Sequence, residues 1–132
     1  MKRIVDFLMD AKVFFLATVD GDSARCRPFG VTVEFEDKLY FATGAAKAVC
    51  KQLQKEPKFE ISAMSKDGAK WIRVNGKAVI DNNVGAKKKL FEIAPNLANI
   101  YGSYDSPAFA VFYADNLSAT IYSFEGAPEK IV

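Results

Sequence analysis

Residues 38–57, KLYFATGAAKAVCKQLQKEP, contain the change of hydrophobic periodicity from which the fold can be worked out. Residues 39–43 are mostly apolar and aromatic, which favours a strand. The apolar residues that follow recur at helical spacing: Ala46, Val49, Cys50 and Leu53. Because the residue before a proline avoids helical geometry, this helix has to end before Pro57. The segment therefore predicts a strand, a turn of small residues and a short helix.

The turn TGAAK, residues 43–47, is a candidate phosphate site. The start of a helix presents backbone N–H groups without intrahelical partners and a partial positive charge, which together accept a phosphate. Lys47 and Lys51 are four residues apart and share a helix face, and Thr43 can add a hydroxyl donor. The same residues also fit a surface helix with two solvated lysines. A Walker A loop is excluded, because its Gly-Lys-Ser/Thr is missing.

Working outward from this segment, the rest of the chain consists of predicted strands with a few short helices. Helical spacing predicts helices over residues 2–11 and 84–93. The stretches rich in β-branched and aromatic residues predict strands over 13–19, 24–35, 59–65 and 70–80, and a hairpin of 109–113 and 118–124 around Asp115 and Asn116. A helical turn with a loop is expected at 96–107, and the tail 125–132 shows no period. We expect one mainly β domain, an antiparallel barrel with helical covers, over residues 1–132.

Composition excludes several classes of function. The net charge of +2 is too small to favour nucleic acid as a partner. No apolar stretch is long enough to span a membrane and no signal-peptide core is present, so the expected location is the cytoplasm. The chain has no histidine, which excludes histidine-based acid–base catalysis and the usual zinc sites. No metal site is therefore predicted.

Two further segments are candidate parts of a ligand site. In RCRPFG, residues 25–30, strand alternation puts Arg25 and Arg27 on one face, beside a proline and a glycine that expose the backbone to a flat ring. An edge strand decorated with arginines fits equally well. In KWIRVNGKA, residues 70–78, Trp71 shares a face with an arginine and could flank a ligand or a subunit interface, although plain core packing is the simpler explanation.

Taken in order, these segments resemble the FMN-binding split-barrel family, the pyridoxamine 5'-phosphate oxidase-like proteins. The likeness is closest to the short branch that includes nitroimidazole-resistance-type proteins. The matching pieces span nearly the whole chain: FFLATVDGDSARCRPFG (14–30), KLYFATGAAKAVCKQLQKEPKFEIS (38–62), KWIRVNGKAVI (70–80) and AVFYADNLSATIYSF (110–124).

The resemblance implies a six-stranded antiparallel split β-barrel that forms a homodimer with two FMN sites between the subunits. Arg27 and Lys47 would bind the FMN phosphate, with Thr43 nearby and Lys51 as a further candidate. The ring contacts implied are the backbone of Pro28, Phe29 and Gly30, then Trp71, and Phe124 from the partner subunit.

The departures from the family narrow the function. Pyridoxamine phosphate oxidases end in a segment with Arg and His that holds the substrate, and residues 125–130 have neither. Nitroimidazole-resistance proteins often carry a histidine near the flavin, which this chain lacks. Neither reaction is therefore the leading expectation.

The leading hypothesis is an FMN-dependent oxidoreductase that reduces a small planar substrate, with NAD(P)H as a candidate donor. The alternatives are a non-enzymatic flavin-binding or redox-sensing module, a deazaflavin or haem in the same groove, and an interaction domain for an anionic partner. No catalytic residue is identified.

Overall fold

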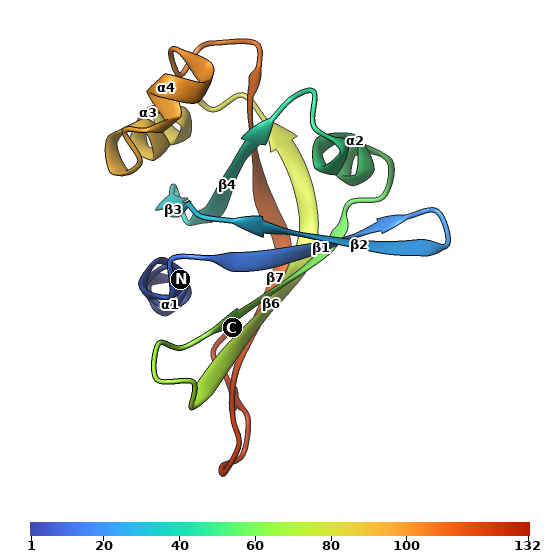
Figure 1. Ribbon diagram of the computed structural model, residues 1–132, viewed down its shortest axis with the longest axis vertical. Coiled ribbons are helices and arrows are strands. Elements are labelled where there is room, and N and C mark those ends of the chain that lie inside the picture. The colour runs from blue at the N-terminus through green and yellow to red at the C-terminus, as the bar shows by residue number, and fades with distance from the viewer.

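The computed structural model describes all 132 residues as one curved antiparallel sheet with short helices around it (Figure 1). The helices are α1 (Lys2–Ala11), α2 (Ala48–Lys55), α3 (Val84–Ile93) and α4 (Leu97–Tyr101). The strands are β1 (Phe14–Asp20), β2 (Ser23–Phe29), β3 (Thr32–Phe35), β4 (Lys38–Gly44), β5 (Lys58–Met64), β6 (Lys70–Asp81), β7 (Phe109–Ser123) and β8 (Glu129–Lys130). The expected mainly β fold with short helices is confirmed.

The two longest helices agree with the sequence pattern because their apolar stripes are clear. In α1, Ile4 and Leu8 lie one turn apart and are fully buried against the sheet. In α3, the Asn83 side chain accepts a hydrogen bond from the backbone N–H of Ala86 at 3.0 Å, which caps the helix immediately before its predicted first residue. No helix is long and apolar enough to cross a membrane.

The strand order is β2-β1-β5-β6-β7-β4-β3, with β8 paired to β7, and every pair is antiparallel. The expected single strand over 24–35 is wrong, because the chain breaks at Gly30 and Val31. Before the break β2 pairs with β1, and after it β3 pairs with β4 at the opposite edge. The same residues thus connect the two edges of the sheet (Figure 1).

The expected count of six strands in a split barrel is not confirmed. The sheet has eight strands and its hydrogen-bonded path is open. One additional strand comes from the break in 24–35 and another from the tail, where Glu129 and Lys130 pair with β7.

The predicted hairpin at the end of the chain is wrong as well. Residues 109–123 form one continuous 15-residue strand, and Asn116, with φ 52°, makes a β-bulge in it. Gly76 of β6 lies opposite the bulge, where a Cβ would stand 2.7 Å from the carbonyl oxygen of Asp115. The left-handed residue and the glycine allow the long pair β6–β7 to bend without ending.

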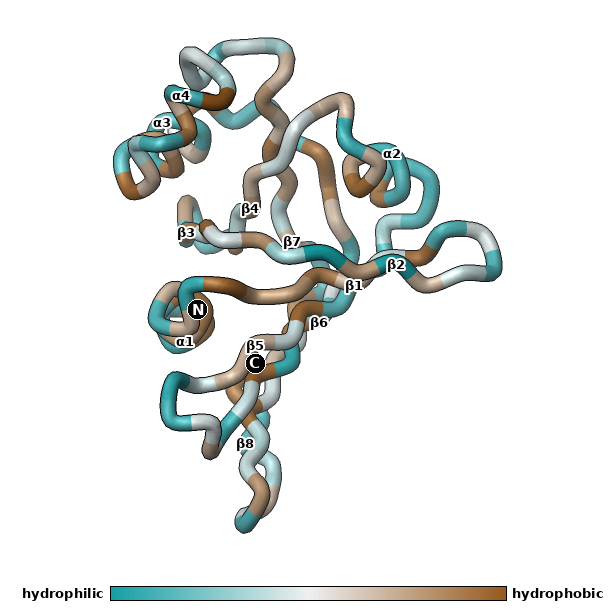
Figure 2. Tube along the Cα trace, in the orientation of Figure 1, coloured by the Kyte–Doolittle hydropathy of each residue, from teal (hydrophilic) through white to brown (hydrophobic).

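The core has two parts. Inside the curve of the sheet, five phenylalanines contact one another edge to face or stacked: Phe14, Phe29, Phe41, Phe59 and Phe112. A second cluster joins the sheet to α3 and α4 through Leu90, Leu97, Phe109 and neighbouring residues. Figure 2 shows hydrophobic residues along β1, whereas β2 carries hydrophilic ones and is mostly exposed. The second cluster matters for function because it holds α4 opposite the turn before α2.

Candidate functional site

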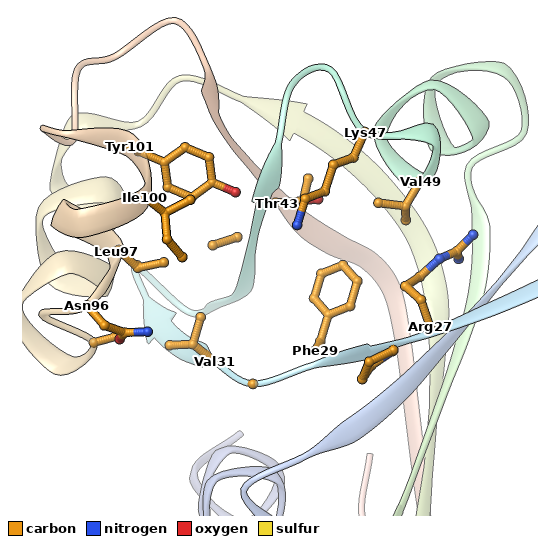
Figure 3. A pocket seen from close by; sticks show the side chains of 14 residues that line it. Arg27, Phe29, Val31, Thr43, Lys47, Val49, Asn96, Leu97, Ile100 and Tyr101 are labelled. Carbon is orange, nitrogen blue, oxygen red and sulfur yellow. The ribbon is translucent and has the colours of Figure 1, made fainter.

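A cavity of about 270 Å³ lies between the β2–β3 connection, β4, the start of α2 and the α3–α4 segment (Figure 3). It is lined by Arg27, Pro28, Phe29, Gly30, Val31, Ala42, Thr43, Lys47, Val49, Ala94, Asn96, Leu97, Ile100 and Tyr101. Six of the nine predicted site residues are among them. The strand that carries the arginine and the turn that carries the lysine, distant in sequence, therefore face the same space.

Arg27 is half-buried and held by neutral groups. Its Nη1 donates to Thr18 Oγ1 at 2.7 Å and to the carbonyl oxygen of Leu16 at 3.2 Å. Its Nη2 donates to Gln52 Oε1, on α2, at 2.6 Å. Burial lowers the pKa of Arg27, yet a guanidinium stays charged at neutral pH. No carboxylate pairs with it, so its positive charge is uncompensated within the chain.

Lys47 supplies the second cation from the turn before α2. It is the N-cap residue, with extended backbone, and no side chain caps the helix start. No acidic residue lies in the first turn of α2, and Lys47 has no ion pair. Figure 3 shows its side chain reaching over the cavity towards Thr43. The positive end of the helix and the lysine therefore act on the same space.

The remaining walls are less polar. The backbone of residues 28–30 is accessible along one side, because Gly30 has no side chain and only Phe29 turns its ring into the core. On the other side, Val31, Leu97 and Ile100 form an apolar wall. A planar ring could lie along such a surface with its polar edge against the strand backbone.

Three predicted residues lie outside the cavity. Lys51 is exposed on α2. Trp71 on β6 lies beside Phe124, which follows the end of β7, with ring centroids 4.9 Å apart, and Trp71 also stacks on Tyr122 at 5.4 Å. We call Trp71, Tyr122 and Phe124 the outer aromatic group. Phe124 is 72% exposed, so this group is open to solvent in the single chain.

The α3–α4 wall was not found by sequence analysis. Its polar members are Asn96, which precedes α4, and Tyr101, which ends α4, in a stretch that the sequence indicated only as a helical turn and a loop. Leu97 and Tyr101 are four residues apart, which places both on one helix face, but nothing local relates that face to the turn at Gly44. The pairing of β7 with β4 brings them together.

The fold and the site together define a class of protein: small, mainly β, with a positively charged cavity at the start of a helix. Within it, this chain belongs to the pyridoxamine 5'-phosphate oxidase family, whose model matches residues 1–117. The resemblance drawn from the sequence is thus confirmed.

Solved structures extend this placement. A NimC/NimA family protein from Clostridium acetobutylicum is 43% identical, with a TM-score of 0.91 over 98% of this chain and 90% of its own. General Stress Protein 26 from Bacillus anthracis is 18% identical, with a TM-score of 0.76 over 98% and 97%. HutZ, the haem storage protein from Vibrio cholerae, is 15% identical, with a TM-score of 0.68 over 88% and 91%. The last two likenesses concern the fold alone. No curated protein sequence matches the chain.

Proposed function

We propose that this protein binds FMN through its phosphate and works as a flavin-dependent oxidoreductase on a small planar substrate. The observation that carries the proposal is the pair of cations in one cavity, Arg27 and Lys47, neither of which meets a carboxylate. Unpaired charge on a partly buried group such as Arg27 is costly unless a ligand compensates it, and exposed Lys47 adds a second positive charge at the mouth of the cavity. A phosphate is the group that suits two cations beside a helix start.

The residues present fit a flavin nucleotide at both of its ends. Arg27, Lys47, Thr43 and the start of α2 would hold the phosphate, and exposed Lys51 would add charge from the outer side of the helix. Pro28, Phe29 and Gly30 would offer backbone groups to the polar edge of the isoalloxazine ring. When bound, the flavin supplies hydride or electron transfer at its N5 atom. The chain's own part is to bind and orient it and to keep water from one ring face.

The cavity alone is small for this ligand, which supports a homodimer. Pockets for ligands of drug size measure about 300–1,000 Å³, and this one is smaller, at about 270 Å³, and open on one side. The outer aromatic group is an exposed apolar feature of the kind that marks interfaces. In the proposed dimer, Trp71 and Phe124 of one subunit cover the flavin bound by the other. We propose that the curved sheet is the split barrel of the flavin-binding members.

Haem is the second ligand to consider, because HutZ shares the fold and is a haem storage protein. Haem iron needs an axial ligand, and this chain has no histidine to offer. Tyr101 is the only cavity-lining side chain that could replace it. The two free cations also suit the phosphate of FMN or of a deazaflavin cofactor. We therefore rank haem second to FMN as the ligand. Oxidation of pyridoxamine phosphate ranks lower still as a function, because residues 125–130 contain neither Arg nor His.

Titration of the purified protein with FMN tests the binding proposal. We expect flavin fluorescence to change on binding and the melting temperature to rise with FMN concentration, as linkage requires. Absence of both effects would refute it. Steady-state oxidation of NADH or NADPH with a quinone or nitroaromatic acceptor then separates an oxidoreductase from a flavin-binding or redox-sensing module.

A further inference from the structure

Tyr101 is held firmly in the wall of the cavity. It is the last residue of α4, which Gly102 closes with φ 87° and a backbone N–H bonded to the carbonyl oxygen of Ala98 at 2.9 Å. Its ring packs on Phe109, at 5.1 Å between centroids, and Phe109 in turn meets Phe91 of α3 edge to face at 5.0 Å. The ring is therefore positioned by the second core cluster rather than by a ligand.

The hydroxyl of Tyr101 and the side chain of Lys47 both approach Gly44. A Cβ built on Gly44 would lie 3.2 Å from Tyr101 Oη and 3.3 Å from Lys47 Cγ, so both side chains close over the same glycine. Any larger residue at position 44 would enter the gap between them. The φ of Gly44 lies outside the left-handed region, so a glycine is needed here because the two side chains come close to its Cα and not because of its backbone conformation.

That hydroxyl makes no hydrogen bond within the chain, and every side-chain oxygen or nitrogen that is buried has a hydrogen-bond partner. Tyr101 Oη must therefore be open to the cavity (Figure 3). Burial of the ring raises the pKa of Tyr101, so the hydroxyl keeps its proton at neutral pH and remains a donor. A tyrosine hydroxyl and a lysine ammonium that line one cavity without partners in the chain suit an acceptor supplied by a ligand.

We propose that Tyr101 and Lys47 together bind the phosphate of the ligand, Tyr101 donating a hydrogen bond from Oη and Lys47 supplying the charge. This inference rests on the proposed function, and it adds a recognition residue from α4 to the site. A phosphate monoester has several acceptor oxygens, so it can accept from a hydroxyl, an ammonium and a guanidinium at the same time. Riboflavin, which has no phosphate, has no anionic group to place between Tyr101 and Lys47.

The test compares FMN with riboflavin, which carries the same ring and no phosphate. Tyr101→Phe removes one oxygen and keeps the ring that packs on Phe109. We expect its Kd for FMN to rise about tenfold, the scale of one hydrogen bond to a charged group. The Kd for riboflavin should stay within about twofold of wild type, since only the phosphate contact is lost. Tyr104→Phe is the matched control, because Tyr104 lies outside the cavity near Lys88.

A second experiment tests whether Tyr101 and Lys47 bind the same phosphate. In a double-mutant cycle, Lys47→Met and Tyr101→Phe should raise the Kd for FMN by less together than the product of their separate effects. Gly44→Ala should also weaken FMN binding, because its Cβ would separate Oη from the lysine.

The outcomes distinguish the proposed role of Tyr101 from the proposed binding of FMN. If wild-type protein binds no FMN, both are overturned. If wild type binds FMN and Tyr101→Phe binds it equally well, only the role of Tyr101 is overturned. Equal losses for FMN and riboflavin would also overturn it, because Tyr101 would then shape the pocket without touching the phosphate.

Discussion

The four arginines of this chain fall into two groups, and the contrast between them explains the site. Three pair with a carboxylate on the surface: Arg3 with Glu129 at 2.8 Å, Arg25 with Asp20 at 3.0 Å and Arg73 with Glu60 at 3.0 Å. The fourth, Arg27, is half-buried and bonds only to neutral oxygens. Because the half-buried arginine is the one left without a carboxylate, we propose that its charge serves a ligand.

The largest expected effect is on FMN binding when this unpaired charge is removed. Arg27→Ala and Lys47→Ala should each weaken binding by about 1.5–3 kcal/mol, as for a charge-assisted hydrogen bond. Calorimetric titration with FMN measures the loss. The matched controls are Arg25→Ala on the same strand and Lys55→Ala at the end of α2, which both lie outside the cavity. Equal losses in the controls would mean that general charge, and not this site, binds the ligand.

A somewhat smaller effect is expected at the proposed interface. Phe124→Ser and Trp71→Ala should each weaken the homodimer by about 1–2 kcal/mol, because exposed aromatic side chains dominate interfaces of this kind. Sedimentation velocity over a dilution series measures the change, and the proposed shared site requires FMN to dissociate along with the dimer. A wild-type monomer with full FMN affinity would contradict the shared site.

The paired arginines should contribute little by comparison. Arg25→Ala and Arg73→Ala should change the free energy of unfolding by at most about 1 kcal/mol, since both ion pairs are about half exposed and screened by solvent. Urea denaturation measures this. A loss similar to that of a core substitution would show that these pairs support the fold and would weaken the contrast with Arg27.

The smallest expected effect is on the stability of the fold at acidic pH, through the ion pair of Arg3 and Glu129. Hydrogen bonds from Arg3 lower the pKa of Glu129 below its usual 4.5, so the folded chain favours the ionised carboxylate. The stabilisation is therefore present above pH 4.5 and is lost as the pH falls through the lower folded pKa. Melting temperatures of wild type and Arg3→Gln should differ slightly at neutral pH and converge in acid. A difference that grows on acidification would reverse the sign and contradict this account.

Local signals in the sequence predicted the parts of the fold that depend on local chemistry. The helix over 84–93 has its cap at Asn83 and its apolar stripe, and both are visible in sequence. The same local chemistry misleads where one residue type serves two purposes. Asn116 suggested a hairpin turn, but its left-handed conformation is equally suited to a bulge, and only the long partner β6 decides between them.

The residues of the site also fall into those that local sequence indicates and those that depend on the fold. Arg27 and Lys47 carry charge next to glycine and proline, so their segments attract attention before the fold is known. Tyr101 could not be found like this, because its position above Gly44 depends on the return of the chain along β7. Trp71 and Phe124 were expected at the flavin, and in the single chain they lie outside the cavity, so contact with the ligand would need the second subunit of the proposed homodimer.

The most direct test of the central claim is the visible absorbance spectrum of the protein as purified, recorded for wild type, Arg25→Ala and Arg27→Ala. We predict a flavin spectrum in wild type and Arg25→Ala, with greatly reduced flavin content in Arg27→Ala. A haem spectrum in wild type, or flavin retained equally in all three proteins, would contradict the claim that the unpaired cations of this cavity bind the phosphate of FMN.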